Sequence, residues 1–139
     1  MKNKKSCILF LICLFALQCA CGAAYEKNWG INIPIQHSVI YSAQYPEETV
    51  RGDGTHFTVV SCSKSILNAD IGVNQSWADV TDDAFTEMME IAAQTRPEKQ
   101  YVPECSSDFK YIKLEEWENL AFILYDDSTM NLYIIERFI

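Results

Sequence analysis

The stretch NLAFILYDDSTMNLYIIERF, residues 119–138, decides the fold of this chain. Leu120–Tyr125 is almost entirely apolar, which is typical of a strand that is covered on both faces. The polar run Asp126–Thr129 then favours a turn, and Met130–Phe138 is again rich in strand-forming residues. We therefore predict a hairpin whose two strands pair antiparallel within a sheet.

Three further strands are predicted from runs of β-forming or alternating residues. They are His37–Tyr45, Thr55–Ser63 and Asp108–Leu114. In the first of these strands, Val39 and Tyr41 are expected on the same face because side chains alternate along a strand. Ser63–Ile71 is expected to form a short helix that a serine begins.

The clearest helix signal lies between the second and third of these strands. Thr81 or Asp82 would cap its first turn, and Arg96 followed by Pro97 would end it. Phe85, Met88, Met89 and Ala92 fall at the spacing i, i+3, i+4, i+7, which places them on one apolar stripe. A stripe of this kind packs on a sheet, so the helix is predicted to cover one face.

The order β-β-α-β-β-β predicts an α+β fold, an antiparallel sheet of about five strands with one main helix packed on one face. We expect residues 37–139 to form a single domain and residues 25–36 to be a tether. Residues 1–24 are interpreted as an N-terminal signal segment, since an apolar run follows three lysines and small residues follow that run.

Three interpretations of the signal segment remain open. In the first, the chain is a lipoprotein with signal 1–20 and a lipid on Cys21, with Cys19 as second choice, and it binds the membrane through that lipid. In the second, a peptidase cuts after Gly22 or Ala24 and releases a secreted protein. In the third, the segment stays as an anchor, although Gln18 interrupts it. Each predicts export, either to the outer surface of the cell membrane or into the medium.

The charge balance bears on the partners of the exported part. The full chain has 11 basic and 19 acidic residues and a net charge of −8. Removing the three lysines of the signal segment leaves 8 basic residues against the same 19 acidic ones, a net charge of −11. Such a chain repels nucleic acid, so we predict no nucleic-acid partner.

Two of the six cysteines, Cys62 and Cys105, lie outside the signal segment. In an exported domain two cysteines most simply form a disulfide, and two free thiols are the alternative. Together with His37 and His56 their spacing matches no compact zinc motif. We therefore predict neither a metal site nor a cofactor.

Catalytic signals are weak, whereas loop aromatics are prominent. Neither histidine belongs to a recognisable triad motif. Trp77, Tyr101 and Trp117 lie in or beside predicted loops, where they could contact a protein or small-molecule partner. The alternative is that these three side chains roof a thin core.

The segments RGDGTHFTVV (residues 51–60) and NLAFILYDDSTMNLYIIERF (residues 119–138), with a helix between them, give the chain a family likeness. It resembles small exported proteins and lipoproteins of Gram-positive bacteria, a group for which no activity is established. The resemblance implies the fold and no reaction. We therefore expect an exported, non-enzymatic binding module. The alternatives are an inhibitor or immunity-type protein that acts on an exported partner, and a small cell-surface hydrolase.

Overall fold

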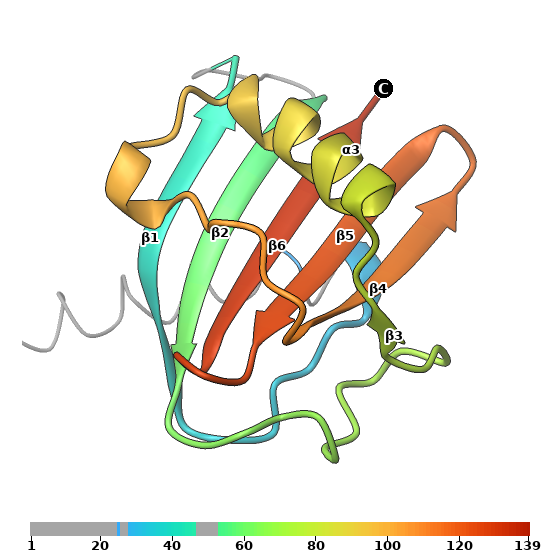
Figure 1. Cartoon of the computed structure of the whole chain (residues 1–139). Coiled ribbons are helices and arrows are strands. Elements are labelled where there is room, and N and C mark those ends of the chain that lie inside the picture. Colours follow the sequence, from blue (N-terminus) through green and yellow to red (C-terminus); the bar gives the residue numbers. More distant parts are fainter. Residues whose placement is uncertain (1–24, 26–27, 47–52) are drawn as a thin grey trace, which may run out of the picture.

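The computed structural model describes residue 25 and residues 28–46 and 53–139 of the chain (Figure 1). Its framework is one antiparallel sheet with the strand order β1-β2-β6-β5-β4-β3. The strands are β1 (His37–Tyr45), β2 (Gly54–Cys62), β3 (Ala78–Asp79), β4 (Phe109–Glu116), β5 (Asn119–Asp126) and β6 (Asn131–Phe138). The predicted C-terminal hairpin is confirmed as β5 and β6, and β5 is buried along nearly its whole length.

The main helix, α3 (Asp82–Ala93), lies across one face of the sheet (Figure 1). The Thr81 hydroxyl accepts a hydrogen bond from the Ala84 N–H at 3.2 Å, which caps the first turn. A short 3-10 helix, η1 (Lys99–Tyr101), follows α3 on the way to β4. The predicted fold class is therefore confirmed. In the part of the chain that the structure describes, no helix is long and apolar enough to span a membrane.

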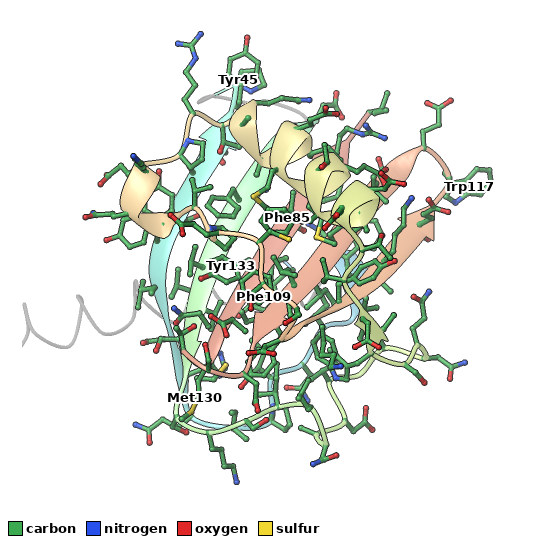
Figure 2. The ribbon with its side chains drawn as sticks, viewed as in Figure 1. Tyr45, Phe85, Phe109, Trp117, Met130 and Tyr133 are labelled. Carbon is green, nitrogen blue, oxygen red and sulfur yellow. The ribbon has the colours of Figure 1, made fainter. Side chains whose placement is uncertain are left out.

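The space between α3 and the sheet is filled by one hydrophobic cluster. Figure 2 shows Phe85 on the helix facing the sheet, with Phe109 and Tyr133 beneath it. The buried members are Phe57, Val59, Met88, Ile91, Ala92, Phe109, Leu120, Phe122, Leu124, Tyr133 and Ile135. They confirm the apolar stripe predicted for the helix, because Met88 and Ala92 lie in the cluster and Phe85 and Met89 pack against it.

The opposite face of the sheet is covered by the N-terminal segment and by the loop after β2. Tyr25, Ile31 and Ile33 are buried there against the sheet, and Ile31 has no exposed surface. The Asn32 N–H donates a hydrogen bond of 2.8 Å to the Ile71 carbonyl, which joins the N-terminal segment to the loop after β2. The prediction that residues 25–36 are a tether is therefore wrong, because their alternating isoleucines complete a second core.

Two local predictions also differ from the structure. The two-residue strand β3 was not expected, and residues 63–71 form turns instead of a helix. Polar side chains in this loop bond to nearby backbone: the Leu67 N–H donates to Ser65 Oγ and the Gly72 N–H donates to Asp70 Oδ1. Bonds of this kind compete with helical hydrogen bonds, which explains the turns.

Strand β1 contains a bulge that changes which face its residues occupy. The pairing with β2 shifts between Val39 and Tyr41, so Ile40 is the additional residue. As a result, Val39 packs against the core on the N-terminal segment's side, whereas Tyr41 packs under α3. The expectation that both lie on one face is wrong for this reason.

Candidate functional site

The most exposed large apolar side chain in the described part of the chain is Trp117, with 96% of its surface accessible. It stands at the tip of the β4–β5 hairpin and points away from the sheet (Figure 2). Glu116 and Asn119 close the hairpin as its last pair, so the loop consists of Trp117 and Glu118. An indole in this position loses the burial that normally stabilises a tryptophan.

The backbone at Trp117 is as unusual as its exposure. Its φ is 59°, and Glu118 is not among the described residues with positive φ. A two-residue hairpin loop with positive φ at its first position alone corresponds to a type II′ turn, in which that position favours glycine. For other residues the left-handed conformation costs roughly 1–2 kcal/mol. Trp117 therefore occupies a costly position with almost its whole surface exposed, which favours a functional role.

Trp117 borders a shallow depression of about 570 Å³ on the helix side of the hairpin. Lys113 lies in it and forms ion pairs with Glu115 at 3.0 Å and Glu87 at 3.5 Å. The hydrogen bond from Lys113 to Glu115 raises the pKa of the lysine, so this cation stays charged. Ile139, which is 69% exposed, lies on the same rim. The Trp117 indole therefore projects from the hairpin beside a depression that is bordered by charged side chains.

We expect Trp117→Gly to raise the free energy of unfolding by about 1 kcal/mol, because glycine adopts positive φ without strain. Urea unfolding of the purified protein measures this change. Glu118→Gly is the matched control. Glu118 does not have a positive φ, so glycine relieves no strain there, and this variant should be less stable than the parent protein. A destabilised Trp117→Gly protein would show that the indole packs in the fold.

The other two predicted contact residues occupy different places and are half-buried. Trp77 lies on the N-terminal segment's side, with its ring centre 5.9 Å from that of Tyr125. Tyr101 lies on the helix side and stacks on Tyr41 at 4.2 Å. The structure does not bring Trp77, Tyr101 and Trp117 together. Trp77 and Tyr101 pack over the two hydrophobic cores. Of the three residues, Trp117 alone has the exposure expected of a contact residue.

A buried carboxylate forms a second unusual feature, on the sheet face away from α3. Glu136 of β6 is 2% exposed and its Oε1 accepts a hydrogen bond of 2.9 Å from Trp29 Nε1. Its Oε2 lies 3.8 Å from Nδ1 of His56, the residue paired with it on β2. Burial raises the pKa of Glu136 from 4.5 to about 7, and hydrogen bonds from Trp29 and Asn28 oppose this rise.

The environment of His56 is also partly desolvated, and burial lowers its pKa. Its Nε2 is buried without a hydrogen-bond partner among the described residues. Groups with shifted pKa values are common at functional sites. However, neither His56 nor Glu136 lines any of four surface depressions of about 290 to 570 Å³. Trp29 donates a hydrogen bond to Glu136, which suits a role for this carboxyl group in holding the N-terminal segment.

The predicted disulfide between Cys62 and Cys105 is wrong. Both residues are free thiols and they are not within disulfide distance. Cys62 ends β2 and is buried in the core beneath the N-terminal segment, where burial raises the pKa of its thiol. Cys105 is exposed in the loop after η1, which runs on the helix side of the sheet. The sheet therefore lies between the two sulfur atoms.

The expected lipidation sites Cys21 and Cys19 lie outside the described residues. Among the residues the structure does describe, Trp29, His56 and Glu136 were not predicted to act together. One sequence signal could have found Glu136: it continues the alternation of Leu132 and Ile134, so it shares their buried face.

No protein-family model, curated protein or solved structure matches this chain. The resemblance to exported Gram-positive proteins therefore remains a prediction.

Proposed function

We propose that this chain is an exported, non-enzymatic binding protein that contacts a protein partner through Trp117. The observation that carries the proposal is the 96% exposure of this indole in a strained turn. Tryptophan is enriched among the residues that dominate binding energy, where it fills a pocket on the partner. Burying the Trp117 ring in such a pocket would remove its apolar surface from water, which the fold of the free protein does not do.

The charge around Trp117 supports a partner of defined chemistry. Glu115, Glu116 and Glu118 flank the indole and are exposed. The chain without residues 1–24 also carries a net charge of −11, from 8 basic and 19 acidic residues. An apolar pocket bordered by lysine and arginine would complement this surface and would speed association.

The same charge argument supports the inhibitor or immunity-type function as a second candidate. A protein that blocks a basic exported partner would bind it more weakly as salt screens the attraction. A cell-surface hydrolase has less support, since Glu136 is buried and the pair of His56 and Glu136 lines none of the four depressions. For localisation we propose export by residues 1–24, with a lipid on Cys21, or on Cys19 as second choice.

Photocrosslinking in the producing cells tests the proposed contact. A benzophenone amino acid placed at position 117 should give a discrete crosslinked product, because the indole would lie inside the interface. Position 130 is the matched control: Met130 is an exposed turn residue with a similar φ of 56°, at the opposite end of the sheet (Figure 2). Equal labelling at both positions, or no product at position 117, would contradict the proposal.

A further inference from the structure

A second depression lies across the β4–β5 hairpin from the Trp117 surface, where the N-terminal segment meets the loop after β2. Its volume is about 340 Å³. We call it the Trp29 groove. The side chains that carry the argument are Asn28, Trp29, Asn74, Gln75, Leu114 and Glu116.

The Trp29 groove is lined by amides and carboxylates. Asn74 and Gln75 supply amides that both donate and accept, and Glu115 and Glu116 supply accepting oxygens. The Asn28 amide also lines the groove and bonds to Glu136. The side chains of Asn74 and Gln75 are exposed and have no hydrogen-bond partner among the described residues. Among the described residues, no lysine or arginine lines the groove, so none of them would balance an anionic ligand.

Trp29 gives the groove an aromatic wall whose orientation is fixed from behind. Its Nε1 donates to the buried Glu136 carboxylate at 2.9 Å, and its ring centre lies 6.0 Å from that of Phe138. Because the indole N–H is already used, the ring can offer a ligand only its apolar surface. Buried support of this kind holds a binding side chain in place before the ligand arrives.

We propose that the Trp29 groove binds a neutral oligosaccharide. Sugars combine hydroxyl groups, which both donate and accept, with apolar C–H faces. The amides and the Glu116 carboxylate match the hydroxyl groups, and the indole matches a C–H face. This inference is independent of the proposed contact at Trp117, which lies outside the groove.

Titration of the purified protein with chitotetraose, cellotetraose and maltotetraose, followed by NMR, tests the proposal. At least one sugar, at millimolar concentration, should shift the Trp29 indole N–H signal and the Asn74 and Gln75 side-chain amide signals. An anionic heparin tetrasaccharide should leave them unchanged, since the described lining carries two carboxylates and no cation.

Asn74→Ala should weaken binding of the sugar by about five- to tenfold, the effect of losing one hydrogen bond. The thermal stability of the Asn74→Ala protein should stay unchanged, because the Asn74 side chain is exposed. Asn68→Ala is the matched control, an exposed amide of the same loop that lines a different depression. Absence of shifts with all three neutral sugars, or equal affinity in Asn74→Ala, would overturn the proposal.

Discussion

Glu136→Gln is expected to stabilise the protein by about 3 kcal/mol at pH 8 and to have little effect near pH 4.5. The reason is the pKa of Glu136, which burial raises from 4.5 to about 7. In the folded state the carboxyl group keeps its proton to higher pH than in the unfolded state. Its contribution is therefore fully present below pH 4.5 and is lost as pH rises through about 7. A tenfold difference in the proton affinity of this group between the two states corresponds to about 1.4 kcal/mol.

Urea unfolding of the parent protein and of Glu136→Gln across this pH range measures the effect. The glutamine amide is neutral, keeps the size of the side chain, and can still accept from Trp29 Nε1. His56 has the opposite influence, because its lowered pKa removes stability as pH falls below 6.5. Because His56 Nδ1 lies 3.8 Å from Glu136 Oε2, the two groups titrate as a coupled pair. The comparison at pH 8, where His56 is neutral, therefore isolates Glu136. Glu116→Gln, at an exposed position, is the control and should change stability by no more than about 0.5 kcal/mol. An equal gain at both ends of the range would show that burial of charge is not the cause.

Ile31→Ala is expected to cost about 2–5 kcal/mol of unfolding free energy, the range for removing a fully buried isoleucine side chain. Ile31 has no exposed surface and packs in the core on the sheet face away from α3. The matched control is Ile40→Ala, because Ile40 is 43% exposed at the bulge of β1. The control should cost less than about 1 kcal/mol.

Chemical denaturation of both isoleucine variants decides whether the N-terminal segment belongs to the folded domain. If Ile31→Ala unfolds at the same urea concentration as Ile40→Ala, the segment is a tether and its packing contributes nothing. A larger loss for Ile31→Ala than for Ile40→Ala assigns the segment to the core. Circular dichroism follows the transition in each case.

The strands were predictable because alternation and apolar runs are local signals. β1 was predicted with its observed bounds, and the hairpin of β5 and β6 was predicted within one residue at each end. The bulge at Ile40 was not predictable, since it depends on how β1 registers against β2. Residues 25–36 were predicted to be a tether for a similar reason: Gly30 and Pro34 break periodicity locally, whereas a distant sheet decides where the alternating isoleucines Ile31 and Ile33 go.

The functional features divide in the same way. Trp117 was predicted as a contact residue from its place beside a loop, but its strained φ is visible only in the structure. Trp77 and Tyr101 carried the same sequence signal and proved to be packing residues. The cluster of Trp29, His56 and Glu136 joins residues that are up to 107 positions apart, so spacing could not reveal it.

The packing of the N-terminal segment would also limit how a lipidated form of the protein lies on a membrane. Tyr25 is already buried in the core, four residues after Cys21. Four residues of fully extended chain reach at most about 14 Å. With a lipid on Cys21, the linker between the membrane and the folded domain would therefore be very short. The domain would lie against the bilayer surface and could not move far from it. A partner would have to reach the domain at the membrane surface.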